Sequence, residues 1–103
     1  MNSYTDPKYY GAQTFYPPSS ADSERLAKSI QNALIEVCDN SNRRTALVKK
    51  EQIVLLRDIK VPTVIIECGF LSNKEEEAKL KTLEYQELIA KGIKQGIDDF
   101  FGK

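Results

Sequence analysis

A single carboxylate closes an apolar run in the second half of the chain. Glu67 follows the apolar residues 64–66 and precedes Cys68 and Gly69. A carboxylate at the edge of an apolar layer is partly desolvated, which suits it to general acid or base catalysis. Glu67 is therefore the first candidate catalytic residue. The alternative is a structural role, because a glutamate at a strand end is more often salt-bridged or exposed to solvent.

The chain contains no histidine, which limits its chemistry. Histidine is the commonest metal ligand and the only side chain that titrates unperturbed near pH 7. A Ser-His-Asp or Cys-His mechanism therefore cannot be housed in this chain alone. Cys38 and Cys68 are too few and too far apart for a disulfide framework or a CxxC metal site, and we expect both to be buried as small apolar residues. Any chemistry of this chain must therefore rest on carboxylates or on groups supplied from outside.

The composition is that of one small globular domain. The chain has 103 residues, of which 41% are apolar and 29% are charged, enough for a modest core. Fifteen basic and fifteen acidic residues leave no net charge to attract nucleic acid, so we expect no nucleic-acid partner. No stretch approaches the roughly 20 apolar residues of a membrane span, and the N-terminus lacks the features of a secretion signal.

The first half of the sequence predicts a strand followed by a helix. Residues 11–16 have strand character, and the prolines at 17–18 end the strand because they cannot donate to a ladder. Ser20 can cap a helix that begins near residue 20 and stops at the turn formers of residues 39–42. The apolar face of this helix is predicted to contain Leu26, Ile30, Leu34 and Val37. The polar residues of this helix, Gln31 among them, are expected to lie outside its apolar face.

Two apolar runs, residues 52–56 and 63–67, predict strands at the centre of a sheet. Continuous apolar runs are typical of strands covered on both faces. The predicted fold is therefore α/β, with a mixed sheet flanked by helices on both faces. The carboxyl end of a central strand is also where ligands commonly bind in open α/β sheets, which favours Glu67.

Two further helices are predicted in the last third of the chain. The acidic run 75–77 follows residues that can cap a short helix, and its simplest interpretation is a cap and a solvated face. A longer helix is predicted over residues 83–101, with apolar residues along one side. Gly92 and Gly96 lie four residues apart on that side, which predicts a close approach to the sheet.

Several motifs in order resemble one enzyme family. Residues 67–73, Glu-Cys-Gly-Phe-Leu-Ser-Asn, resemble the signature of the zinc-dependent N-acetylmuramoyl-L-alanine amidases of the amidase-3 family. Residues 11–16 resemble the strand after the last zinc histidine, especially in the spore-germination members. The remaining matches are Ser23, Leu26, Ala27, Ile30 and Gln31, then Asn42 and Arg43, Leu55 to Arg57, Pro62, Tyr85 and Gln86. The resemblance spans essentially the whole chain, so we expect residues 1–103 to be the C-terminal part of a single catalytic domain with a truncated amidase-3 fold.

The resemblance implies a peptidoglycan hydrolase with Glu67 as its acid/base. Family members cut the amide bond between N-acetylmuramic acid and the L-alanine of the stem peptide, with one zinc ion held by two histidines and a glutamate. Met1 and Asn2 resemble the last two positions of the H-x-N zinc motif, so we expect the zinc ligands to lie upstream. Zinc is expected in the complete domain, but this chain alone is expected to bind none tightly and to be inactive.

Other assignments rest on the resemblance and leave alternatives open. Arg43 is a candidate for binding a stem-peptide carboxylate, since arginine suits bidentate recognition, although a structural salt bridge is the simpler interpretation. The expected partner is peptidoglycan, in the cell wall, outside the cell or in the spore cortex, and a partner chain is a possible source of the missing half. The alternative functions are a non-catalytic module that binds peptidoglycan or a partner protein, and an unrelated small α/β domain.

Overall fold

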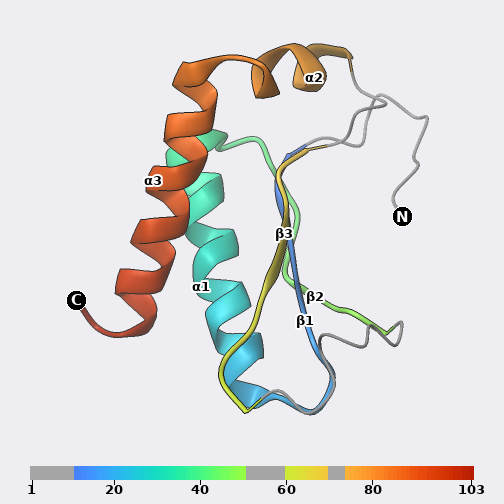
Figure 1. Ribbon diagram of the computed structural model, residues 1–103, viewed down its shortest axis with the longest axis vertical. Coiled ribbons are helices and arrows are strands. Elements are labelled where there is room, and N and C mark those ends of the chain that lie inside the picture. Colours follow the sequence, from blue (N-terminus) through green and yellow to red (C-terminus); the bar gives the residue numbers. More distant parts are fainter. Residues whose placement is uncertain (1–10, 51–59, 70–73) are drawn as a thin grey trace.

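The computed structural model describes residues 11–50, 60–69 and 74–103, which form three strands and three helices (Figure 1). The elements in chain order are β1 (Gln13–Tyr16), α1 (Ala21–Cys38), β2 (Leu47–Val48), β3 (Ile65–Glu67), α2 (Lys74–Leu80) and α3 (Leu83–Phe100). The strand order is β2-β1-β3, with β1 parallel to β2 and antiparallel to β3. The predicted mixed α/β architecture is therefore confirmed.

The centre of the described sheet is β1, whereas the run 63–67 was predicted to lie there with the run 52–56, whose position stays a prediction. The run 63–67 does contain a strand, but β3 pairs only with β1 in the described sheet, while the run 52–56 lies outside the described residues. Apolar content does not identify the central strand here, because the buried residues of β1 include the polar Gln13 and Thr14, which are 2% and 0% exposed. Their polar atoms are hydrogen-bonded, so the most buried strand is not the most apolar one.

Helix α1 begins and ends where capping residues predict. The Ser20 hydroxyl oxygen accepts a hydrogen bond from the Ser23 amide at 3.2 Å, and Asp39 follows the last turn. Ile30 and Leu34 are buried as expected. Gln31 is a correction, because it is only 1% exposed and faces β1. Its amide hydrogen-bonds to the strand, which is why a polar residue occupies the buried face.

Helices α1 and α3 pack at close range through the two glycines of α3. A methyl group added at Gly96 would lie 2.4 Å from the Ile30 Cα, and one at Gly92 would lie 2.8 Å from the Leu34 Cδ2. The Ser29 hydroxyl donates to the Gly96 carbonyl oxygen at 2.6 Å. The close approach predicted from the two glycines therefore exists, but it is made to α1 and not to the sheet.

The described elements form three layers, with α1 between the sheet and α3 (Figure 1). The core cluster lies between these layers and consists of Ala12, Ile30, Leu34 and Ile89. Helices α1 and α3 lie on the same side of the sheet, so helical cover of the second face stays a prediction for residues outside the described ranges. Within those ranges no helix is long and apolar enough to cross a membrane.

Candidate active site

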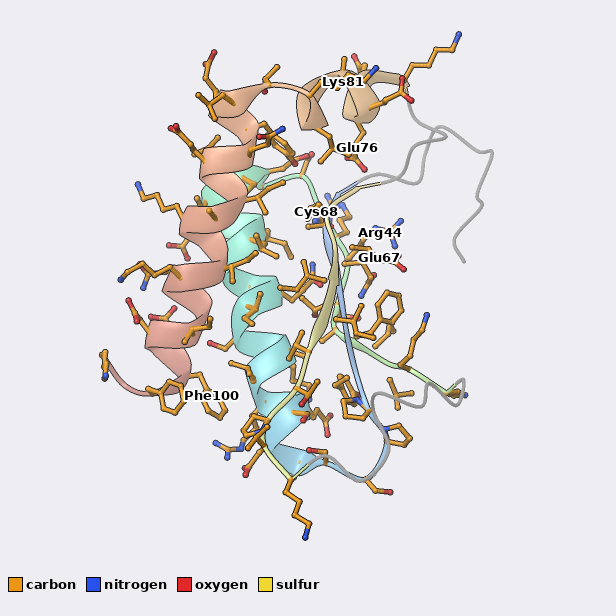
Figure 2. The ribbon with its side chains drawn as sticks, viewed as in Figure 1. Arg44, Glu67, Cys68, Glu76, Lys81 and Phe100 are labelled. Carbon is orange, nitrogen blue, oxygen red and sulfur yellow. The ribbon has the colours of Figure 1, made fainter. Side chains whose placement is uncertain are left out.

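Glu67 is the last residue of β3 and lies directly opposite Gln13 of β1 in the antiparallel ladder. The neighbouring Ile66 and Cys68 pack against the core cluster on the α1 side. Because side chains alternate along a strand, Glu67 points to the other face, where Figure 2 shows it beyond the sheet as viewed from α1. The structure leaves Glu67 half-buried. This position fits a carboxylate that is held by the sheet and remains accessible from one side.

Gln13 links this face to a nearby guanidinium. Its Nε2 donates to the carbonyl oxygens of Thr45 and Thr14 at 2.6 and 2.8 Å, and its Oε1 accepts from the Arg44 Nη1 at 3.2 Å. Residues directly opposite on one face of an antiparallel pair have Cβ atoms about 5 Å apart. Arg44 and Glu67 are therefore both neighbours of Gln13, and Figure 2 shows both on the side of the sheet away from α1.

The arginine of this cluster is Arg44, not its neighbour Arg43, which was the candidate from the sequence. The structure leaves Arg43 exposed. The Arg44 amide donates to the Asn42 Oδ1 at 2.9 Å, which fixes the backbone from which its guanidinium reaches Gln13. The sequence contained a weak signal for this arrangement, since a glutamine in a predicted strand requires hydrogen-bond partners when it is buried.

Asn42 holds the start of β1 in place. It is 5% exposed, and its Nδ2 donates to the Ala12 carbonyl oxygen at 3.1 Å. Its side chain fills the space beside Gly11, where an added methyl group would lie 2.6 Å from the Asn42 Cγ. Gly11 has φ +93°, a conformation that glycine adopts without strain. Asn42 is thus a buried residue that links the segment after α1 to the start of β1, and not only a turn residue.

Glu76 is a buried carboxylate that the sequence did not distinguish from its acidic neighbours. It was expected on a solvated face, yet it is 4% exposed. Its Oε2 accepts a hydrogen bond of 2.6 Å from the Gly11 amide, and its side chain lies against Gly69. No local pattern in the sequence signals this role, because the partner of Glu76 lies 65 positions away.

The two cysteines are free thiols that pack against the core cluster, as expected for small apolar residues. Burial raises the pKa of the Cys38 thiol, and the nearby Cys68 and Asp39 add to that shift. Burial also raises the pKa of the Cys68 thiol. The shift favours the protonated thiol, which is a weaker nucleophile than the thiolate.

The residues of this chain do not fit the zinc site that the resemblance implies. That site needs two histidines, and the sequence contains none. In the described ranges there is also no group of three or more histidine, cysteine, aspartate or glutamate side chains that could hold a metal ion. Glu67 and its neighbours are the candidate groups for chemistry that the described residues offer.

Comparison with known proteins places these features in one family. The family profile of N-acetylmuramoyl-L-alanine amidases of the amidase-3 type matches residues 1–99. A germination-specific N-acetylmuramoyl-L-alanine amidase of Bacillus subtilis is 35% identical over 101 residues, which are 98% of this chain and 42% of that protein. The N-acetylmuramoyl-L-alanine amidase AmiC of Escherichia coli is 32% identical over 81 residues, covering 79% of this chain and 19% of that protein.

Solved structures agree with the sequence relatives. The CwlD amidase from Clostridioides difficile, determined in complex with the GerS lipoprotein, is 45% identical and superposes with a TM-score of 0.92. The match covers 99% of this chain and 51% of that one, so the chain spans about half the length of this relative. An N-acetylmuramoyl-L-alanine amidase from Clostridium difficile 630 is 30% identical, with a TM-score of 0.78 over 91% of this chain and 50% of that one. The chain therefore belongs to the amidase-3 family of N-acetylmuramoyl-L-alanine amidases.

Proposed function

We propose that this chain supplies the part of an amidase domain that carries its acid/base carboxylate. The proposed reaction is hydrolysis of the amide bond between N-acetylmuramic acid and L-alanine in peptidoglycan. The observation that carries the proposal is the position of Glu67, which stands in the segment that resembles the family signature and lies at the end of β3, opposite Gln13. The named relatives include germination-specific and cell wall amidases, which supports the cell wall or the spore cortex as the location of the substrate.

The proposed role of Glu67 is to move one proton during hydrolysis. Its carboxylate accepts a proton from the attacking water as the carbon–oxygen bond forms. The resulting carboxylic acid then gives that proton to the amide nitrogen as the carbon–nitrogen bond breaks, so the carboxylate is regenerated. The ladder with β1 holds the residue in place, and Arg44, which donates to Gln13 beside it, provides a guanidinium to orient a substrate.

The zinc ion implied for the complete domain would be held by residues outside this chain. The 103-residue chain is accordingly proposed to bind no zinc tightly and to release no stem peptide. The missing groups would come from sequence upstream of residue 1 or from a partner chain. A longer polypeptide is therefore needed to test the proposed activity, made either with the natural upstream coding sequence or with the first half of the Clostridioides difficile relative.

The decisive experiment replaces Glu67 in that longer polypeptide. Glu67→Gln should abolish release of stem peptide from purified peptidoglycan while the zinc content stays unchanged, because the amide keeps the size of the side chain but cannot accept the proton. The matched control is Glu36→Gln, which alters an exposed glutamate of α1 and should leave the rate unchanged. Full activity in Glu67→Gln would remove this residue from the mechanism.

The absence of histidine favours a second candidate function for the chain by itself, a non-catalytic module that binds peptidoglycan or a partner protein. Sedimentation of the 103-residue chain with purified sacculi separates the two functions. Binding without hydrolysis by both the short and the longer polypeptide would support the module. Hydrolysis by the longer polypeptide alone would support the enzyme.

A further inference from the structure

Glu76 occupies a position that its two acidic neighbours on α2 do not share. It is 4% exposed, whereas Glu75 is exposed and Glu77 is half-buried beside Lys81. The Oε2 of Glu76 lies 2.6 Å from the Gly11 nitrogen, across 65 positions of sequence. A hydrogen bond of this length to an ionised acceptor belongs to the strong, charge-assisted class.

Glu76 touches Gly11, which extends β1 toward the N-terminus, and Gly69, which extends β3 toward the C-terminus. In the ladder, Gln13 pairs with Glu67 and Thr14 with Ile66, so paired residue numbers add to 80. Continuing this register by two residues would bring Gly11 opposite Gly69, because 11 and 69 also add to 80. The paired strands, however, end at Gln13 and Glu67. Beyond that point Glu76 contacts both segments.

The contact with Gly69 is steric and complements the hydrogen bond to Gly11. A methyl group added at Gly69 would lie 2.7 Å from the Cγ and from the Oε1 of Glu76. The Glu76 side chain therefore lies in the space that the missing Gly69 side chain leaves. Gly11 is confined on another side by Asn42, whose Cγ would lie 2.6 Å from an added methyl group. Both extensions are thus fixed by side-chain contacts beyond the end of the paired strands.

We propose that Glu76 is a positioning residue for Glu67. Glu76 accepts a hydrogen bond from the Gly11 amide and packs on Gly69. In this way it holds the segment that follows Glu67 against the segment that precedes β1. This fixes the direction of the catalytic carboxylate at the end of the sheet. A carboxylate suits this role because it accepts strongly from a backbone amide that is buried and has lost its contact with water. The inference rests on the proposed amidase function, since it concerns the reacting group of that site.

The first test uses the 103-residue chain and does not depend on activity. The amide proton of Gly11 should resonate far downfield in the amide NMR spectrum, because it donates a short hydrogen bond to a carboxylate. Glu76→Ala should remove this shift, and Glu76→Gln should reduce it. Glu75→Gln, in the same turn of α2, should leave it unchanged. An unchanged Gly11 resonance in Glu76→Gln would overturn the inference, and this near-isosteric variant provides the test if Glu76→Ala does not fold.

The second test measures the same variants in the longer polypeptide, per folded molecule with zinc bound. Glu76→Ala should lower kcat by about 10- to 100-fold with little change in KM, as expected when a catalytic group is misplaced. Glu76→Gln should recover part of the loss, because its amide oxygen can still accept from Gly11. A purely structural residue would change the amount of folded protein but not kcat. Unchanged kcat in Glu76→Ala, with Glu67→Gln inactive, would overturn the positioning role and leave the proposed function standing. Full activity in Glu67→Gln would overturn both.

Discussion

Gln13 and Glu67 face each other across the ladder of β1 and β3, and the same Gln13 side chain accepts a hydrogen bond from Arg44. The buried amide therefore connects a basic residue of the loop before β2 to the strand that ends in the candidate catalytic carboxylate. Gln13 is itself fixed by its donation to the Thr45 carbonyl oxygen at 2.6 Å. A sheet residue with no chemistry of its own thus brings together the polar groups of the site.

The two adjacent arginines are expected to differ in their effect on activity. In the longer polypeptide, Arg44→Ala should lower kcat/KM by about 10- to 100-fold, because a hydrogen bond from its guanidinium to the substrate would contribute about 1.5–3 kcal/mol. Arg43→Ala should lower it by less than about 3-fold, because Arg43 is exposed and hydrogen bonds at the surface contribute little. Steady-state kinetics on soluble peptidoglycan fragments would measure both. A larger loss for Arg43→Ala would support the substrate-binding role predicted from the sequence.

Gln31 should be important for stability although it is polar. Its Oε1 accepts from the Thr14 amide at 2.8 Å, and its Nε2 donates to the Ala12 carbonyl oxygen at 2.9 Å. Gln31→Leu keeps the volume but leaves the buried Thr14 amide without this acceptor, whereas the Ala12 carbonyl oxygen still accepts from the Asn42 Nδ2. We therefore expect a loss of about 1–3 kcal/mol in the free energy of unfolding. Urea denaturation would measure the loss. Asn32→Ala, at an exposed position of the same helix, should change stability by no more than about 0.5 kcal/mol.

The two glycines of α3 should respond differently to alanine. Gly96→Ala would place a methyl group 2.4 Å from the Ile30 Cα, so the α1 backbone would have to move. We expect a net loss of about 2 kcal/mol or more, even though alanine favours a helix by about 1 kcal/mol over glycine. Gly92→Ala meets the Leu34 Cδ2 first, and that end of a side chain can rotate away. Thermal unfolding of both variants should show the smaller change for Gly92→Ala, and equal losses would contradict this packing.

Tyr85 should make stability depend on pH under alkaline conditions. Burial, with the charges of nearby groups including Cys38 and Glu76, raises the pKa of Tyr85 to about 12. An unfolded tyrosine has a pKa of about 10, so the unfolded chain loses this proton first as the pH rises. The contribution of Tyr85 to the free energy of unfolding is therefore fully present below about pH 10 and is lost between about pH 10 and 12. Urea denaturation across this range should show a steeper decline for the natural chain than for Tyr85→Phe, and parallel curves would contradict the assignment.

The predictable part of the fold is the part that depends on apolar periodicity and capping. Helix α1 starts after Ser20 as expected, because a cap and an apolar stripe are local signals. The roles of Gln31 and Glu76 were not predictable from local pattern, since each is polar and is buried by a partner far away in the sequence. The short strand β2 was not predicted either, because two residues are too few to show a period.

The candidate site was likewise only partly predictable from the sequence. Glu67 could be selected because its family signature and its place after an apolar run coincide. Gln13 and Arg44 could not, because their contact joins residues 31 positions apart and depends on the pairing of β1. Sequence reasoning therefore selected the candidate Glu67, whose catalytic role stays a prediction, but not the side chains around it, whose positions are set by tertiary structure.

The contact between α1 and α3 also affects when the protein can fold during synthesis. Ser29 and Gly96 are 67 positions apart, and α3 is made after every other described element. Until α3 has left the ribosome, the side of α1 that receives Gly92 and Gly96 remains uncovered, and the nascent chain exposes apolar surface to solvent. Contacts between such distant residues form slowly, and exposed apolar intermediates aggregate. A longer time in this unfinished state would then lower the amount of folded protein that a cell recovers.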